Sequence, residues 1–214
     1  IFSIIIIIFF SPLLIIICII SFFVQGLPIF YISERMVARD KIIKIFKFRT
    51  MVKDAKDEKY KLNEKYFNND YLDIPITDKV YTPLGRFLER TQIVEIPQVF
   101  AVLFGKLSFI GNRPLPKSNV EIIKKNFPDK WFKRFDSPCG MTGISQVVGK
   151  FKLTPEERLE LEALYSEVYL NGNVFKADTY IFFSTIILLI FGDSVAYRGI
   201  ENAKKIMKSC LKIK

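Results

Sequence analysis

Three cationic residues in this 214-residue chain have the types and spacing needed to hold a phosphate ester. Lys47 and Arg49 are two apart in the segment KFRTM, and side chains at that spacing on a strand point to the same side. Arg113 lies in GNRPLP, where Pro114 and Pro116 stiffen the loop and suit a bidentate contact with phosphate. A solvated strand face would explain Lys47 and Arg49 equally well.

One carboxylate, Glu95, stands among apolar neighbours in TQIVEIPQVF. Pro97 suits the first turn of a helix and Gly105 suits its end, so Glu95 is expected at a helix N-terminus, where an anion is favourable. Capping alone could account for it. The chain has no histidine and its three cysteines are scattered, so any metal is expected to be a hard cation bound by oxygen.

Residues 1–24 predict a membrane helix, because they carry no charge and their only polar members are three serines. About 20 apolar residues suffice to cross a bilayer. A cleaved signal peptide has a shorter apolar region and a small-residue cleavage site, and neither is present. The chain opens inside this run without a methionine, so we expect further residues before it.

Pro12 lies near the centre of this segment, where the missing N–H and a clash with the preceding turn predict a kink or a break. From physics alone, a kinked spanning helix is favoured over one that enters the membrane and returns. Basic residues follow the segment and indicate a cytoplasmic flank. They are Arg35, Arg39, Lys41, Lys44, Lys47, Arg49 and Lys53.

The formal net charge of +10 favours an anionic membrane surface or a phosphorylated substrate. Nucleic acid is a less favoured partner, because the chain has a membrane segment and no recognisable nucleic-acid-binding motif.

The remaining pattern predicts a mixed α/β (α+β) domain with several amphipathic or interfacial helices. Thr154 and Glu157 form a capping box, so a helix is expected to begin there. Residues 180–191 are apolar but too short to span, and the basic tail from 203 to 214 could lie on a membrane surface. Other expected elements are strands at 28–37, 42–51 and 106–110, a surface helix or insertion at 52–72, and a helix at 84–91.

In order, these segments resemble the bacterial sugar transferase family, the polyprenyl-phosphate hexose-1-phosphate transferases of monotopic membrane type. The segments that carry the resemblance are Ser11-Pro12, KFRTM at 47–51, residues 77–91, residues 95–116, GMTGISQVVG at 140–149 and residues 156–165.

The resemblance implies transfer of a sugar 1-phosphate from a UDP-sugar to undecaprenyl phosphate, which initiates exopolysaccharide, O-antigen or glycan assembly. It also implies a requirement for Mg²⁺. Residues 1–24 would form a re-entrant membrane helix broken at Ser11-Pro12, and residues 25–214 a domain on the cytoplasmic face of the bacterial inner membrane. This reverses the preference for a spanning helix.

For the site, the resemblance implies an Asp-Glu pair in which the aspartate attacks the β-phosphate and the glutamate belongs to the magnesium site. Glu95 matches the glutamate, whereas Val94 occupies the position of the aspartate. Lys47, Arg49 and Arg113 would hold the diphosphate.

Val94 departs from the family pattern in a way that bears on catalysis, since valine cannot attack phosphorus. The chain could be a non-catalytic paralogue that binds lipid phosphate or serves as an assembly scaffold, a decayed copy, or a chain altered at one position. Glu95 acting as nucleophile is least favoured, because a misplacement of about 1 Å costs roughly 100-fold. Smaller departures are Asn112, where proline is common, and Glu162, where aspartate is usual; Asp78 matches a family aspartate without an assigned role.

Overall fold

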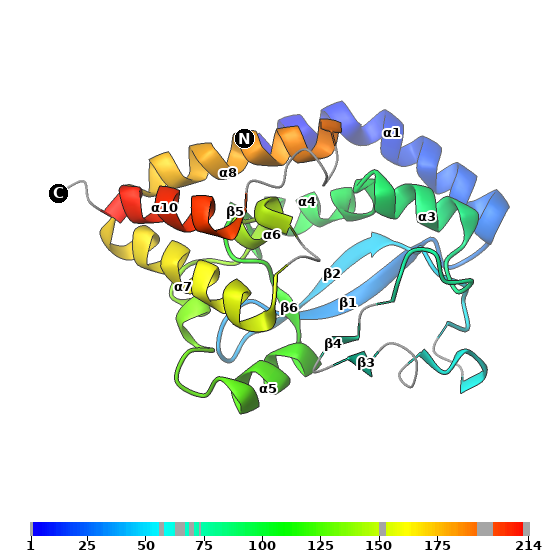
Figure 1. Ribbon diagram of the computed structural model, residues 1–214. Coiled ribbons are helices and arrows are strands. Elements are labelled where there is room, and N and C mark those ends of the chain that lie inside the picture. The colour runs from blue at the N-terminus through cyan, green and yellow to red at the C-terminus, as the bar shows by residue number, and fades with distance from the viewer. Residues whose placement is uncertain are drawn as a thin grey trace. The chain divides into compact units, whose positions relative to one another are not determined.

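The chain folds into a mixed α/β structure, as the sequence predicts, and it is seen here in a computed structural model (Figure 1). The structure describes residues 2–55, 58–62, 67–68, 71–72, 74–149, 153–191 and 199–211. Two compact units make up the chain: residues 1–33 with 44–104, and residues 34–43 with 105–214.

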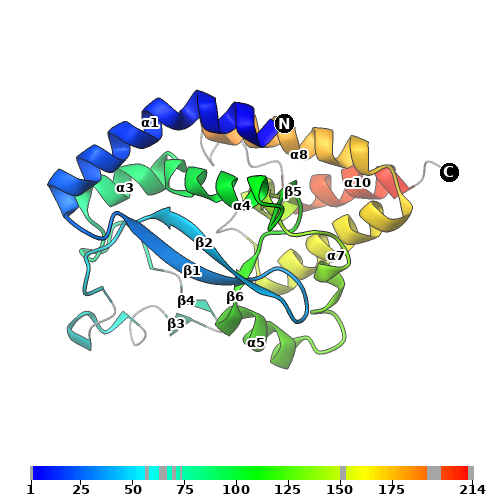
Figure 2. The same ribbon diagram turned by 180° about the vertical axis from the view of Figure 1, so that it is seen from behind.

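The first unit begins with α1 (Phe2–Gln25), which continues through Pro12 without interruption. The break expected at Ser11-Pro12 is therefore not present in the helix, and Figures 1 and 2 show an arched helix instead. Proline removes one backbone donor and can bend a helix without ending it. Ser11 Oγ donates a hydrogen bond of 2.8 Å to the Ile8 carbonyl one turn earlier. The re-entrant path of this segment stays a prediction.

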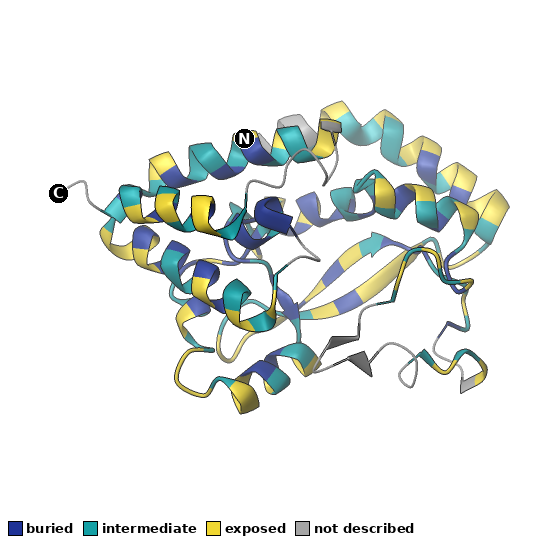
Figure 3. Cartoon of the chain, in the orientation of Figure 1, coloured by how far each residue is buried: buried dark blue, intermediate teal, exposed yellow. Residues whose placement is uncertain are grey.

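α1 has the length and composition of a membrane segment over Ile7–Gln25, with a mean hydropathy of 3.0. Only 11% of this stretch is buried, so α1 differs from the core helix of a soluble protein. Figure 3 shows exposed positions along the described part of α1. The most exposed apolar side chains of the described part of α1 are Ile8, Phe9, Ile15, Phe23 and Val24.

The expected hairpin forms from β1 (Phe30–Met36) and β2 (Ile42–Phe48), and the sheet order is β2-β1-β6. In the 52–72 segment the described residues form η1 (Glu58–Tyr60) and the strand pair β3 (Phe67–Asn68) and β4 (Tyr71–Leu72). Other parts of that expected insertion lie outside the described residues. The first unit ends with α3 (Pro83–Arg90), the 3₁₀ helix η2 (Ile93–Gln98) and α4 (Val99–Leu103), which packs against α1.

The second unit pairs short strands with a group of helices. β5 (Ser108–Ile110) runs parallel to β7 (Gly140–Thr142), and β6 (Leu115–Pro116) pairs with the end of β1. The helices are α5 (Lys117–Asn126), η3 (Lys133–Phe135), α6 (Ile144–Gly149), α7 (Pro155–Asn171), α8 (Val174–Phe191) and α10 (Ile200–Leu211).

A single apolar core joins α6, α7, α8 and α10, and both ribbon views show α7, α8 and α10 together (Figures 1 and 2). The predicted capping box begins α7: Glu157 N–H donates to Thr154 Oγ1, and Thr154 N–H donates to Glu157 Oε2. Both bonds satisfy donors that a helix start would leave without partners. This anchored helix supplies one wall of the polar network described below.

Candidate active site

Glu95 lies in the first turn of η2, so the expected position at a helix N-terminus is confirmed. Gln92 precedes the helix in a left-handed conformation with φ of 58°, and its side-chain amide donates to the Glu89 carbonyl. η2 leads directly into α4, and Pro97 is buried inside η2, so its expected place in the first turn of the helix is wrong because the helix begins earlier, at Ile93. The helix dipole favours an anionic side chain at this end.

Val94, next to Glu95, has its side chain in an apolar cluster and is 1% exposed. The buried members of that cluster are Ile17 of α1, Phe48 of β2, Leu88 of α3 and Val94 itself. The cluster ties η2 to three other elements of the first unit. Position 94 therefore contributes apolar packing in this chain, where the family pattern would place a carboxylate.

Arg49 follows the last residue of β2 and is 8% exposed. Its Nε donates to the Pro28 carbonyl at 2.7 Å, and its Nη2 donates to the carbonyls of Gln25 and Gly26 at 2.6 and 2.8 Å. Carbonyls at a helix C-terminus lack partners within the helix, so these bonds satisfy the end of α1. They favour a structural role, and phosphate binding by Arg49 stays a prediction.

Lys47 lies within β2 and is partly exposed, with its ammonium 5.4 Å from the centre of the Tyr31 ring. The expectation that Lys47 and Arg49 form one cationic strand face is only partly met, because β2 ends at Phe48 and the Arg49 guanidinium turns to the backbone near α1. Lys47, Arg49 and Glu95 belong to the first unit, and Arg113 belongs to the second.

The loop that carries Arg113 starts at Gly111, which is packed against the Gly140 strand. A Cβ on Gly111 would lie 2.2 Å from the Pro138 carbonyl oxygen, and a Cβ on Gly140 would lie 2.2 Å from the Gly111 nitrogen. Both positions require glycine because two backbones meet there. The Gly140 strand therefore approaches the backbone of the loop that carries Arg113.

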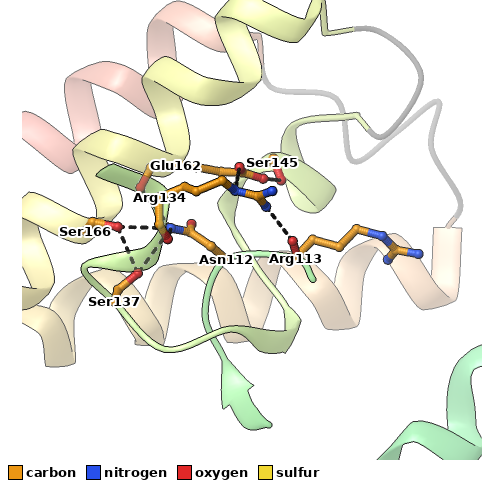
Figure 4. A network of polar contacts seen from close by, with 7 residues as sticks. All are labelled: Asn112, Arg113, Arg134, Ser137, Ser145, Glu162 and Ser166. Atoms are coloured by element: carbon orange, nitrogen blue, oxygen red, sulfur yellow. Dashed lines mark hydrogen bonds and ion pairs between the residues drawn. The ribbon is translucent and has the colours of Figure 1, made fainter. Parts of the chain in front are cut away.

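Asn112 and Arg113 are held by a buried polar network (Figure 4). The Asn112 amide nitrogen is within hydrogen-bond distance of the backbone carbonyls of Arg134 and Glu162, at 2.8 and 3.0 Å. It is also near two serine hydroxyls, those of Ser137 and Ser166, which bond to each other at 2.9 Å.

An ion pair forms the second part of this network. Arg134 Nε lies 2.9 Å from Glu162 Oε2, and the two side chains are 1% and 0% exposed. Arg134 Nη2 donates to the Arg113 carbonyl at 2.5 Å, and Ser145 donates to Glu162 Oε1 at 3.0 Å. The network thus contacts the backbone of Arg113, whose side chain extends away from it in Figure 4.

The two departures from the family pattern in this unit, Asn112 and Glu162, are both buried members of the network. Tyr165, one turn beyond Glu162, donates a hydrogen bond of 2.8 Å to Asp178 Oδ1 on α8. Burial raises the pKa of Tyr165, and it also raises the pKa of Asp178, which the Tyr165 hydrogen bond lowers in part.

Asp78 has a local structural role. Its Oδ1 accepts a hydrogen bond from the Val80 N–H at 2.8 Å, which is the pattern of an Asx turn. Its carbonyl accepts a bond from Arg86 on α3. Asp78 therefore orders the turn that leads into α3.

The described residues contain no group of three or more His, Cys, Asp or Glu side chains able to hold a metal. Glu95 offers one carboxylate. Mg²⁺ usually keeps several waters and binds through one or two carboxylates together with substrate phosphates. This donor set fits a Mg²⁺ ion that is bound jointly with a diphosphate.

Arg134 is the residue that sequence reasoning missed. It lies in WFKRFDSP, among aromatic and basic residues that suggest nothing more than surface charge. Its partners are a carboxylate on α7 and a backbone carbonyl in the Arg113 loop, and neither leaves a recognisable spacing in the sequence.

Comparison with known proteins identifies the class. The chain belongs to the bacterial sugar transferase family, whose profile matches residues 1–192. This agrees with the resemblance found in the sequence.

Three relatives illustrate the match. The UDP-glucose:undecaprenyl-phosphate glucose-1-phosphate transferase of Klebsiella pneumoniae is 29% identical over 85% of this chain and 37% of its own length. The uncharacterized sugar transferase EpsL of Bacillus subtilis is 30% identical over 65% of this chain and 61% of its own length. The undecaprenyl-phosphate galactose phosphotransferase of Salmonella typhimurium is 29% identical over 66% of this chain and 30% of its own length. The chain thus spans 30% to 61% of the length of these relatives.

Proposed function

We propose that this chain is a transferase that moves a sugar 1-phosphate from a UDP-sugar to undecaprenyl phosphate at the cytoplasmic face of the bacterial plasma membrane in polysaccharide synthesis, with its activity impaired because Val94 occupies the position of the nucleophilic aspartate. The names of the Klebsiella and Salmonella relatives support the two substrates. The exposed apolar surface of α1 and the basic flank that follows it support the location.

In this proposal the reaction is the family's two-step displacement. A carboxylate at position 94 would attack the β-phosphorus of the UDP-sugar, form a carboxyl–phosphate bond and release UMP. The phosphate of the lipid acceptor would then attack the same phosphorus, and the carboxylate would leave. Val94 has no nucleophilic atom, so the unmodified chain is expected to release UMP far more slowly than a chain with aspartate there.

The remaining roles fall to charged residues that this chain retains. Lys47 and Arg113 would hold diphosphate oxygens, and Glu95 would hold Mg²⁺ together with the substrate. When bound, Mg²⁺ would neutralise charge on the diphosphate. Glu95 suits this task because it is a carboxylate at a helix start that is only partly buried.

A second candidate is a non-catalytic membrane protein that binds lipid phosphate or a sugar nucleotide, or serves as an assembly scaffold. The observation that favours it is the burial of Val94 among Ile17, Phe48 and Leu88. Val94 packs four elements together, so it stabilises the fold whether or not the chain is catalytic.

An assay of UMP release separates the two candidates. The unmodified chain, Val94→Asp and Val94→Asn would each be purified in detergent and given UDP-glucose or UDP-galactose, undecaprenyl phosphate and Mg²⁺. Val94→Asn is the matched control, since it has a similar size and polarity to aspartate but no carboxylate.

Release by Val94→Asp alone would support the transferase proposal and assign the loss to position 94. If the unmodified chain and Val94→Asn release UMP as fast as Val94→Asp does, position 94 is not the nucleophile. If none of the three releases UMP although all bind UDP, the non-catalytic candidate is favoured.

A further inference from the structure

We propose that Arg134, held by Glu162, is a positioning residue that fixes the backbone of Arg113 and thereby sets the direction of the Arg113 guanidinium toward a diphosphate. This inference rests on the proposed function, because it assigns Arg113 to UDP-sugar binding. It adds two residues that neither the sequence nor the comparisons assign to the site.

Burial of the Arg134–Glu162 pair carries an energetic cost. Arg134 and Glu162 are almost fully buried, and removing two charges from water is expensive. Buried ion pairs are often replaceable by apolar residues of similar volume without loss of stability. In the described part of the chain, Arg134 Nη1 and Asn112 Oδ1 are also buried without a hydrogen-bond partner. A contribution to stability alone therefore does not explain why a charged pair is buried at this position.

Arg134 and Glu162 contact the loop that carries Arg113. One side of the Arg134 guanidinium meets Glu162, and Nη2 donates to the Arg113 carbonyl. The preceding residue, Asn112, is held through its own amide by the carbonyls of Arg134 and Glu162. Pro114 follows and restricts the backbone on the other side. Consecutive residues of one short loop are therefore immobilised from helix α7 and the 3₁₀ helix η3.

The direction of the Arg113 side chain also fits a positioning role for Arg134. The network binds the carbonyl of Arg113, and in Figure 4 the Arg113 side chain points away from Glu162, Ser145 and Ser166. A fixed Cα position and backbone orientation narrow the volume that the guanidinium can reach. Bidentate contact with a diphosphate depends on that geometry, since small displacements of a binding group cost much of its effect.

The experiment measures the affinity of the full chain for UDP by calorimetry in detergent with Mg²⁺. UDP is the probe because every UDP-sugar shares its diphosphate. The variants are Arg113→Ala, the double variant Arg134→Met/Glu162→Met, and the triple combination. The double variant replaces the ion pair by apolar side chains of similar length, so that no single buried charge is left behind. Thermal unfolding of each variant is measured in parallel.

We expect Arg113→Ala and the double variant each to weaken UDP binding by roughly tenfold or more, while the double variant unfolds at a temperature close to that of the unmodified chain. In the triple variant, the loss should equal that of Arg113→Ala alone, because Arg134 acts through Arg113. If the Arg134–Glu162 pair were purely structural, its replacement would leave UDP affinity unchanged, or would weaken it by an amount that adds to the effect of Arg113→Ala.

Three other results would overturn the inference. The first is a double variant that folds and binds UDP as tightly as the unmodified chain. The second is a triple variant in which the loss of UDP affinity from the double variant adds fully to that from Arg113→Ala. The third is an Arg113→Ala variant with unchanged affinity for UDP. An unmodified chain that does not bind UDP would overturn the proposed function itself, and with it this inference. If the double variant does not fold, Arg134→Lys and Glu162→Asp give the same test: Arg134→Lys keeps the charge but loses the planar fork, and should weaken UDP binding more than Glu162→Asp does.

Discussion

The guanidinium of Arg49 donates a hydrogen bond of 2.6 Å to the backbone carbonyl of Gln25, the last residue of α1. The same side chain bonds the next carbonyl, that of Gly26, which has a φ of 69° and ends the helix by donating its N–H to the Phe22 carbonyl. Arg49 thus joins the end of the apolar helix to the strand that carries Lys47.

The first prediction follows from these bonds. Arg49→Lys should lower the free energy of unfolding by about 2 to 4 kcal/mol, because an ammonium cannot reproduce the fork that serves three carbonyls. Thermal or denaturant unfolding in detergent measures the change. Lys47→Met is the comparison: it should weaken UDP binding with little effect on stability. If Arg49→Lys is as stable as the unmodified chain and only UDP binding falls, Arg49 holds phosphate as the resemblance implies.

The second prediction concerns the cost of restoring a carboxylate at position 94. Val94→Asp places an ionisable group in an apolar cluster at a position that is 1% exposed, so the variant should be less stable than the unmodified chain by about 2 to 4 kcal/mol at pH 7. Burial disfavours the charged carboxylate. The free energy of unfolding of Val94→Asp should therefore fall further below that of Val94→Asn as the pH rises above about 4. Unfolding curves of the three proteins across pH test this. A Val94→Asp variant as stable as the parent at pH 7 would contradict the apolar environment described for Val94.

The third prediction concerns Asp178, which accepts the Tyr165 hydrogen bond. Burial raises the pKa of Asp178 above its ordinary value of 3.8, so the folded state retains this proton to higher pH than the unfolded state does. Its contribution to stability is therefore greatest at low pH and falls as the pH rises through the folded-state pKa.

Asp178→Asn should remove that fall, because asparagine does not titrate but still accepts the Tyr165 hydrogen bond. At pH 7 the Asn variant should be the more stable protein, and the difference should shrink toward pH 4. Melting temperatures between pH 4 and 8 measure the effect, with the exposed Asp129→Asn as control. A constant difference in melting temperature across this range, or a less stable Asn variant at pH 7, would show that ionisation of Asp178 does not destabilise the folded protein.

Local patterns in the sequence determine much of this protein. The apolar run of α1, the two strands of the hairpin, the Thr154–Glu157 capping box and the place of Glu95 in a helix start were all predictable, because each depends on residues close together in the chain. The order of motifs also predicted the family, which the profile match over residues 1–192 confirms.

The tertiary structure alone decided what Arg49, Val94 and Arg134 do. Arg49 bonds backbone carbonyls, which every residue possesses and which therefore leave no mark in a sequence. Val94 looks like an ordinary apolar residue until folding brings it against Phe48 and Leu88. Arg134 and Glu162 meet only because η3 and α7 pack together, so the strength of their pairing depends on burial, which sequence spacing does not reveal.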